Sequence, residues 1–513
     1  MLTERASGTI LHISSLPSFG GIGDLGLAAH AFVEFLQAAR MRYWQVLPLG
    51  PTGLGNSPYS ALSAFAGNPL FLSLETLSDQ GWLERERLAG LPGERGPVDF
   101  GRVTARKMAL LEMAAGNFVD RCNSGEYSGK LRDRFVEFCR EQAYWLDDYA
   151  SFRVLRQAYH DASWRTWPEE HRKRAPEAME RLRSSHARAL AIEQALQFFF
   201  AEQWGALRWH CGEKGLRLIG DAAIFVNYDS ADVWAHPGLF ELDAEGTPVR
   251  VSGVPPDYFS KTGQRWGNPL YRWDELEQQG FDWWTKRLRR SLELYDMVRL
   301  DHFRGFEAYW AIPATEKTAI HGEWVPAPGE KLFAVLEREL GGLPLIAEDL
   351  GVITPEVDAL RRRFHLPGMR VLQFGFADRG GHIHLPHQYE ENTVAFTGTH
   401  DNDTTLGWWQ KAPPEVRRNV LAYLRPGEDG VVWAMMRAAA TSVARLCLFP
   451  FQDILGLDST ARMNTPAQVD GNWAWRCPPG ALRPELADKL AELMEVTDRD
   501  TNSTPEKIED NAP

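Results

Sequence analysis

Short apolar runs alternate with amphipathic segments along most of the chain. Eight runs have the character of buried strands and end in polar or turn residues, at 8–15, 42–50, 216–226, 295–303, 343–351, 369–376, 392–401 and 444–453. Helical patterns adjoin several of them, at 28–40, 282–295, 354–365 and 413–424. Buried strands that alternate with helices indicate parallel βα units. Eight such units predict an α/β protein built on a (β/α)8 TIM barrel, with an open doubly wound sheet as the alternative.

The second and third runs are too far apart for a simple loop, so residues 52–190 are predicted to form an inserted, mainly helical subdomain. Amphipathic patterns at 102–122 and 130–160 supply its main helices. The barrel itself is then expected over 1–51 and 191–495.

Two further segments stand apart from the alternating pattern. Residues 227–280 are rich in Gly, Pro, Trp and Tyr and are predicted to be an ordered active-site loop insertion. Residues 496–513 are polar and are predicted to be a disordered tail.

Composition narrows the classes of function. The 513-residue chain has a formal charge of −13, which argues against binding to nucleic acid. We expect no signal peptide at the N-terminus and no membrane span, because no apolar stretch approaches the length that a bilayer requires. The five scattered cysteines predict free thiols in a reducing cytoplasm. The 19 tryptophans suit either the apolar faces of sugar rings or a large core.

Four of the apolar runs end close to a carboxylate: Asp221, Asp301, Glu348 and Asp401. In a TIM barrel the carboxyl ends of the strands form the active-site face. One acid after a strand often caps the next helix, but four that converge on one face point to chemistry. A close pair of carboxylates can cleave and form glycosidic bonds, one as nucleophile and the other as general acid and base.

Neighbouring residues distinguish the roles within this set. Arg299 lies two positions before Asp301 and shares its face of the strand, which favours the ionised form that a nucleophile needs. Glu348 follows two apolar residues, a setting that favours a protonated acid. Asp349 competes for that role, and we favour Glu348 because its side chain is longer by one methylene. His400 and Asp401 end the seventh run together and can bind sugar hydroxyls and stabilise positive charge on the ring.

Several long motifs resemble one family. The segments "MVRLDHFRGF", "IAEDLG" and "FTGTHDND" are similar to conserved segments of the α-amylase superfamily. The longer segments "SSLPSFGGIGDLG", "QVLPLGPTGLGNSPYSALSAFAGNP", "VWAHPGLFELD", "GVPPDYFSKTGQRWGNPLYRW" and "GNWAWR" resemble its 4-α-glucanotransferase branch, from about residue 8 to residue 476.

The resemblance implies transfer of segments between α-1,4-glucans, such as maltooligosaccharides, starch or glycogen, by a retaining double displacement. It also implies that no separate C-terminal β-domain follows the barrel, and little more than one helical pattern follows Arg476. We expect no cofactor and no metal site. It assigns Asp301 as nucleophile, Glu348 as general acid/base and Asp401 as transition-state stabiliser. It implies substrate contacts for a second set of residues: Tyr59, Asp221, Trp266, Arg299, His400 and Asn472. An α-1,4-glucan hydrolase on the same scaffold is the alternative, and a catalytically silent glucan-binding protein is a third hypothesis.

This sequence departs from the family pattern at three positions. Ala222 and Ala223 stand where the family usually has a bulkier residue and a proline, and Ala467 stands where a glycine is usual. We expect these departures to affect local loop shape.

The string GIGDLG at 21–26 matches the G-x-G-x-x-G pattern of dinucleotide-binding proteins. Five residues separate it from the end of the preceding apolar run, and the region about 20 residues further on holds no acid, so both structural conditions for a nucleotide site fail. We therefore predict a turn at the rim of a sugar site, with Asp24 as a cap for the following helix. His210, His236 and His302 lack the spacing of metal ligands and are interpreted as polar or core residues.

Overall fold

The computed structural model describes residues 2–91, 93, 95–125, 129–256, 260–378, 381–468 and 470–500. Its centre is a parallel sheet of eight strands in the order β10-β11-β12-β1-β2-β3-β6-β9. The strands are β1 (Ala6–Ile10), β2 (Tyr43–Gln45), β3 (Arg217–Ala223), β6 (Met297–Asp301), β9 (Leu345–Ala347), β10 (Gly368–Val371), β11 (Thr393–Phe396) and β12 (Leu446–Pro450). Each of the eight predicted runs overlaps one of them.

The two outer strands of this order meet and nearly close the sheet into a barrel. The N–H of Ala347 at the end of β9 donates to the carbonyl of Pro367, just before β10, at 2.9 Å. Alternate residues point inward, so the barrel is filled by a cluster that includes Ile219, Ile346 and Leu448. The intervening residues, such as Val298 and Leu300, face the surrounding helices. Both faces of each strand are therefore buried, which explains why the strands read as continuous apolar runs. The predicted TIM barrel is confirmed.

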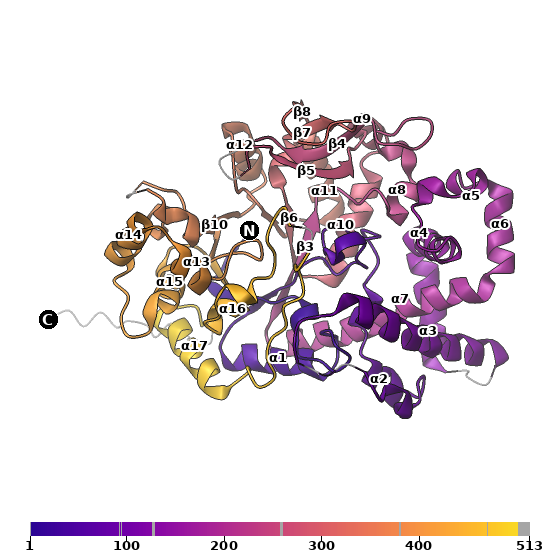
Figure 1. Ribbon diagram of the computed structural model, residues 1–513, viewed down its shortest axis with the longest axis horizontal. Coiled ribbons are helices and arrows are strands. Elements are labelled where there is room, and N and C mark those ends of the chain that lie inside the picture. Colours follow the sequence, from indigo (N-terminus) through magenta and orange to yellow (C-terminus); the bar gives the residue numbers. More distant parts are fainter. Residues whose placement is uncertain are drawn as a thin grey trace.

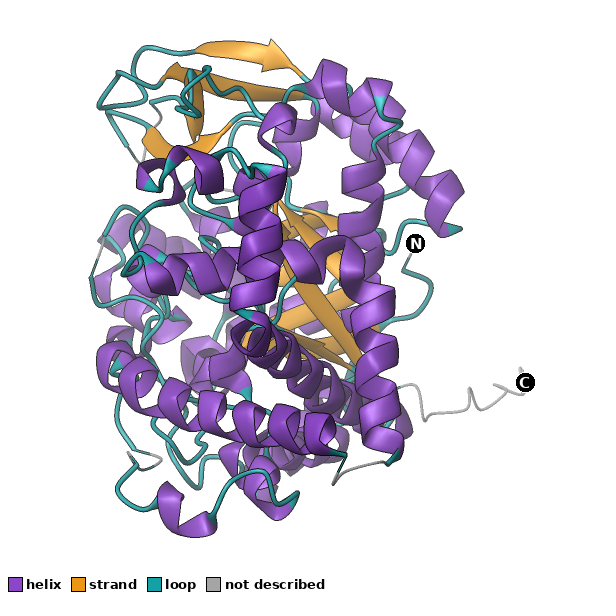
Figure 2. Ribbon diagram, turned by 90° about the vertical axis from the view of Figure 1, so that its right-hand side faces the viewer, coloured by secondary structure: helices purple, strands orange, loops and turns teal. Residues whose placement is uncertain are grey.

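Helices surround the barrel (Figures 1 and 2). Those outside the residue 52–190 segment are α1 (Leu27–Ala38), α8 (Ala231–Ala235), α9 (Trp273–Gln278), α10 (Asp282–Leu294), α11 (Gly329–Leu340), α12 (Pro355–Arg363), α13 (Thr405–Lys411), α14 (Pro414–Leu424), α15 (Gly430–Thr441), α16 (Phe451–Ile454) and α17 (Pro484–Val496). The four helical patterns of the sequence correspond to α1, α10, α12 and α14. Helix α10 shows the reason for its pattern, because Trp284, Leu288 and Ser291 lie one turn apart and are all buried.

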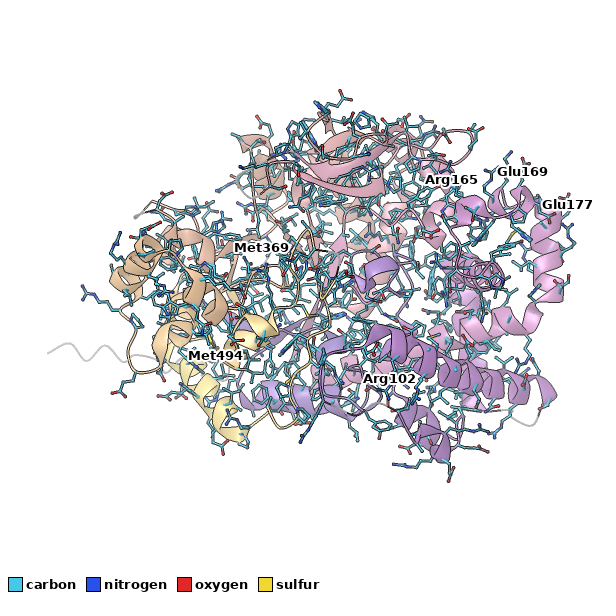
Figure 3. The ribbon with its side chains drawn as sticks, viewed as in Figure 1. Arg102, Arg165, Glu169, Glu177, Met369 and Met494 are labelled. Carbon is cyan, nitrogen blue, oxygen red and sulfur yellow. The ribbon has the colours of Figure 1, made fainter. Side chains whose placement is uncertain are left out.

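Between β2 and β3 the chain forms α2 (Leu74–Asp79), α3 (Phe100–Ser124), α4 (Lys130–Ala158), α5 (Glu169–Arg172), α6 (Pro176–Ser185) and α7 (Ala187–Glu213). Figure 1 shows these helices to one side of the barrel. Helices α3 and α7 pack through aromatic rings, with Phe118 and Phe199 at 5.2 Å between centroids. The acidic side chains of Glu169 and Glu177 lie at the outer edge of this region, away from the barrel (Figure 3).

A second, antiparallel sheet lies over one side of the barrel (Figure 1). Its strands are β4 (Arg250–Val254), β5 (Gln264–Pro269), β7 (Ala308–Pro313) and β8 (Glu323–Pro326), in the order β5-β4-β7-β8. Two of them lie in the segment 227–280 that the sequence analysis interpreted as a loop, of which residues 257–259 are outside the described part. The sheet is not evident in the sequence because Pro269 is the one buried residue of β5 and because β4 pairs with β7, which lies beyond β6.

The described residues after β12 contain short helices and α17, and no strand among them. Residues 497–500, which the sequence analysis assigned to a disordered tail, are packed in place. Arg499 is fully buried and donates to the carbonyls of Ala6, Ala440 and Ala444 at 2.7–2.8 Å. These bonds anchor the segment to β1 and to the end of α15, so the predicted tail starts too early. Residues 501–513 lie outside the described residues.

Candidate active site

Three of the four predicted acids lie at the carboxyl ends of neighbouring strands. Asp221 is in β3, Asp301 ends β6 and Glu348 directly follows β9. The register of β3 against β6 places Asp221 opposite Arg299. Arg299 and Asp301 alternate with Val298 and Leu300, which face the helices, so both point to the barrel interior. The site is thus at the face where TIM barrels carry their chemistry.

Arg299 joins two of these carboxylates. Its guanidinium donates to Asp221 Oδ2 at 2.7 Å and to Asp301 Oδ1 at 2.8 Å. The Asp221 side chain is fully buried, whereas the Asp301 side chain is 30 % exposed. Asp301 is therefore the member of the pair that a substrate can reach.

Tyr59 and His400 extend the network on the other side of Asp221. The Tyr59 hydroxyl donates to Asp221 Oδ2 at 2.8 Å and lies 2.9 Å from His400 Nε2. Because the hydroxyl proton goes to Asp221, His400 carries a proton on Nε2 and donates to the Tyr59 oxygen. The two rings also stack, with 5.3 Å between centroids. Burial, with the Asp221 charge adding to it, raises the pKa of Tyr59 well above its ordinary value, so the hydroxyl stays a donor.

Glu348 sits beside Asp301 in a buried setting. Its Oε2 accepts from the N–H of His302, the residue after Asp301, at 2.7 Å, and its Oε1 accepts from the N–H of Leu350 at 3.0 Å. Burial raises the pKa of Glu348 to about 8, against the opposing effect of Arg299. Burial likewise raises the pKa of Asp221 to about 6. Glu348 is thus protonated at neutral pH, which suits a general acid.

The sequence left Asp349 as a competitor of Glu348. In the structure Asp349 accepts from the N–H of Met369 at 2.6 Å and pairs with Arg370 at 3.1 Å. Its carboxylate binds the start of β10 and helps to hold the sheet together, so the structure favours Glu348 for chemistry.

Asp401 follows β11 on a loop and is held by residues that the sequence analysis did not single out. Asn464 Nδ2 donates to Asp401 Oδ1 at 2.6 Å, and Arg462 donates to the Asp401 carbonyl, also at 2.6 Å. His400 Nε2 lies 3.5 Å from the same Oδ1. Asn464 and Arg462 lie beyond the last strand in a segment without a motif that names them, and only the fold brings them to this acid.

Of the two remaining predicted residues, Trp266 lies beside the acids, whereas Asn472 makes its hydrogen bonds within its own loop. Trp266 on β5 is 39 % exposed and meets the His302 ring edge-on at 4.8 Å, which brings it beside Asp301. Asn472 instead braces its own loop, accepting from the N–H of Thr465 at 2.8 Å and donating to the carbonyl of Gln468 at 2.9 Å. A substrate contact of Asn472 therefore stays a prediction.

Two hollows flank the Tyr59–His400 pair. One, of about 640 Å³, includes Tyr59 and Asp221 in its lining, and the other, of about 440 Å³, includes His12, His400 and Arg462. Of the four acids, Asp221 lines one of these hollows, and the side chains of Asp301 and Asp401 are 30 % and 45 % exposed.

The GIGDLG segment has a structural role that its G-x-G-x-x-G pattern does not indicate. Gly26, not Asp24, is the N-cap of α1, so the predicted cap is wrong. Asp24 accepts from the N–H of Gly26 at 3.1 Å within the turn and forms a buried ion pair with Lys107 of α3 at 3.3 Å. A side chain at Gly23 would meet the Ile13 carbonyl at 1.8 Å, so this position requires a glycine.

Two of the three histidines that the sequence analysis set aside, His210 and His302, contact a neighbouring ring. His210 Nδ1 lies 2.8 Å from His30 Nδ1, and burial lowers the pKa of His302 to about 4. Among the described residues, no group of three or more His, Cys, Asp or Glu side chains is arranged to hold a metal ion. The same part of the chain contains no helix long and apolar enough to cross a bilayer.

An eight-stranded barrel with acidic side chains gathered at the carboxyl ends of its strands defines the class: a TIM-barrel enzyme with its active site at that face. A family model described as 4-alpha-glucanotransferase matches residues 11–482. The chain belongs to the 4-alpha-glucanotransferase family.

Individual relatives agree with this assignment. The 4-alpha-glucanotransferase of Thermus thermophilus is 50 % identical over 97 % of this chain and 100 % of its own length. That of Synechocystis sp. is 45 % identical over 97 % of this chain and 99 % of its own. The solved amylomaltase from Streptococcus agalactiae, in complex with acarbose, superimposes with a TM-score of 0.92 at 35 % identity, over 97 % of this chain and 100 % of that one.

Proposed function

We propose that this enzyme transfers segments of α-1,4-glucans to the 4-hydroxyl of an acceptor glucan or glucose by a retaining double displacement. Its family membership and its full-length relatives make it a 4-alpha-glucanotransferase and favour transfer over the hydrolase alternative. The mechanism rests mainly on one observation, which is that two neighbouring carboxyl groups have different surroundings. Arg299 pairs with Asp301, while burial raises the pKa of Glu348 to about 8.

In the first half of the reaction, Asp301 Oδ attacks the anomeric carbon and the bond from that carbon to the glycosidic oxygen breaks. Glu348 gives its proton to the departing oxygen. A covalent glucosyl–Asp301 ester and a shortened glucan result. We assign Asp401, whose side chain is 45 % exposed, to stabilise the positive charge that develops on the ring.

In the second half, the 4-hydroxyl of an acceptor sugar attacks the same carbon. Glu348, now a carboxylate, takes the hydroxyl proton, and Asp301 leaves with the electron pair of the ester bond. Both partners regain their starting states. We assign acceptor contacts to Trp266, whose exposed ring lies beside His302 next to Asp301. Sugar contacts in the donor site are assigned to Tyr59, Asp221, Arg299 and His400, and a further glucan contact to Asn472.

Maltooligosaccharides and starch- or glycogen-type glucans are the substrates that this mechanism takes, and none of its steps uses a cofactor, a metal ion or a nucleic acid. We place the enzyme in the cytoplasm because its five cysteines are all free in the structure, as is typical of a reducing compartment.

Incubation of the purified protein with maltotriose tests the proposal. We expect glucose together with a ladder of longer oligosaccharides, and steady hydrolysis without longer products would refute it. Asp301→Asn, which is close to isosteric and retains one acceptor for Arg299, should lower kcat/KM by at least about 1,000-fold. Asp349→Asn, which alters the neighbouring acid assigned to the sheet, serves as the matched control and should retain the product ladder.

A further inference from the structure

Asn464, which donates to the Asp401 carboxylate, lies in a short loop after β12. The loop begins and ends at the same place, because the N–H of Trp473 donates to the carbonyl of Met463 at 2.8 Å. Inside it, the side chain of Asn472 spans from Thr465 to Gln468. The loop is therefore closed on itself and carries Asn464, near its start, in a defined position.

Asn464 forms three hydrogen bonds, with partners in or near Asp401. Its N–H donates to the carbonyl of His400 at 3.1 Å. Its carbonyl accepts from Arg462 Nε at 2.7 Å. Its side-chain Nδ2 donates to Asp401 Oδ1 at 2.6 Å. Because the backbone of Asn464 is bound on both sides, its amide group is presented to Asp401 with little freedom to turn away.

We propose that Asn464 is a positioning residue for Asp401, fixing the carboxylate through a neutral donor. An amide orients one oxygen and leaves the full negative charge of Asp401 available to the reacting sugar. A cation at the same point would orient the carboxylate but would offset that charge, as Arg299 does at Asp301. Since the Asp401 side chain is 45 % exposed, it would otherwise be free to adopt other rotamers in solvent.

The charged and polar groups around Asp401 are consistent with this role of Asn464. The groups that face Asp401 and Asn464 are His400, whose Nε2 is 3.5 Å from Asp401 Oδ1, Arg462, which donates to backbone carbonyls, and Tyr59, which packs on His400. Arg462 donates its hydrogen bonds to the backbone carbonyls of Asp401 and Asn464. The short hydrogen bond to the Asp401 carboxylate therefore comes from the side-chain amide of Asn464. The inference rests on the proposed role of Asp401 in the reaction.

Replacement of Asn464 by Ala tests the proposal first. We expect kcat for maltotriose disproportionation to fall about 10- to 100-fold with a smaller change in KM, because a hydrogen bond to a charged group that orients it for the transition state is lost. Gln468→Ala changes an exposed side chain of the same loop and should stay within about threefold of the wild type. If Asn464→Ala also stays within threefold, or if both variants lose activity equally, the proposal is wrong.

Asn464→Asp supplies a signature that a purely structural role would not give. The new carboxylate would lie beside Asp401, and the two groups would share a proton at low pH and repel each other at high pH. We expect the activity of Asn464→Asp relative to wild type to rise at least about 10-fold between pH 7.5 and pH 5, because the introduced carboxyl group, once protonated, again donates to Asp401. The ratio for Asn464→Ala should stay flat. A flat ratio for both variants would overturn the proposal.

These experiments can refute the proposed glucan transfer and the proposed role of Asn464 independently of each other. The product ladder of the wild type tests glucan transfer, whereas the inference is tested only by ratios of variant to wild type at each pH. A wild type that makes no longer oligosaccharides would refute the proposed function. A normal wild type with an unaffected Asn464→Ala variant would refute the role of Asn464 alone.

Discussion

Arg299 and Asp301 lie two residues apart on β6 and form an ion pair of 2.8 Å, in which the arginine side chain is buried and the carboxylate is 30 % exposed. The same guanidinium binds the fully buried Asp221 at 2.7 Å. One planar cation thus fixes the reacting carboxylate to a second acid that solvent does not reach. The arrangement uses the forked geometry of arginine, which a point charge cannot reproduce.

Arg299→Lys should therefore be strongly deleterious although the charge is retained. A lysine ammonium on a shorter, single-ended side chain cannot span Asp221 and Asp301 together, and one buried carboxylate is left without its partner. We expect kcat/KM for maltotriose to drop at least about 100-fold, with folding checked by circular dichroism. A folded variant with activity within fivefold of the wild type would contradict this role.

The pH dependence of activity should show a limb on the alkaline side. Burial raises the pKa of Glu348 from its ordinary value near 4.5 to about 8, and the protonated form is the one that donates to the leaving oxygen. The active fraction is therefore complete well below that pKa and is lost as the pH rises through it. We expect kcat/KM to decline above about pH 8, approaching tenfold per pH unit, in initial-rate measurements of glucose release from maltotriose. A profile that is flat up to pH 9 would exclude Glu348 as the acid.

The buried pair of Asp24 and Lys107 should stabilise the joint between the turn before α1 and helix α3. Both side chains are buried, and their charged groups lie 3.3 Å apart. Lys107→Met leaves the Asp24 charge buried without a cation, and we expect the free energy of unfolding to fall by about 3–5 kcal/mol in urea titrations.

A double variant separates the charge effect from packing. Asp24→Asn keeps an acceptor for the N–H of Gly26 but carries no charge, so a chain with both Asp24→Asn and Lys107→Met should be clearly more stable than one with Lys107→Met alone. Equal stabilities of the single and the double variant would show that the loss comes from packing and not from an unpaired charge.

Ala467 occupies a backbone conformation that favours glycine, with φ at 66°. This explains why a glycine is usual at this position in the family that the sequence resembles. Ala467→Gly should relieve the strain and raise the free energy of unfolding by about 0.5–1 kcal/mol, measured in urea. Ala89, which is also exposed but has φ at −60°, provides the matched control, because Ala89→Gly should lower stability by a similar amount. If both variants are destabilised, the strain at Ala467 is not significant.

Much of the fold can be predicted from the sequence because its signals are local. The barrel strands are buried on both faces, so they read as short continuous apolar runs, and the helices between them show a regular amphipathic period. The antiparallel sheet β5-β4-β7-β8 gives no such signal. Only Pro269 of β5 is buried, and β4 pairs with β7, which is separated from it by α9, α10 and a barrel strand.

Some features of the candidate site could likewise be predicted from the sequence, whereas others could not. The sequence alone determined that Asp221, Asp301, Glu348 and Asp401 follow the strands of one barrel, and that Arg299 and Asp301 share a face of β6, because strand ends and a period of two are local properties. Only the tertiary structure decided that Tyr59 reaches Asp221 and His400, that Asn464 rather than a charged group holds Asp401, and that Asp24 pairs with Lys107. These contacts join residues that lie 63 to 341 positions apart, and polar pairs of this kind form only where packing brings their elements together.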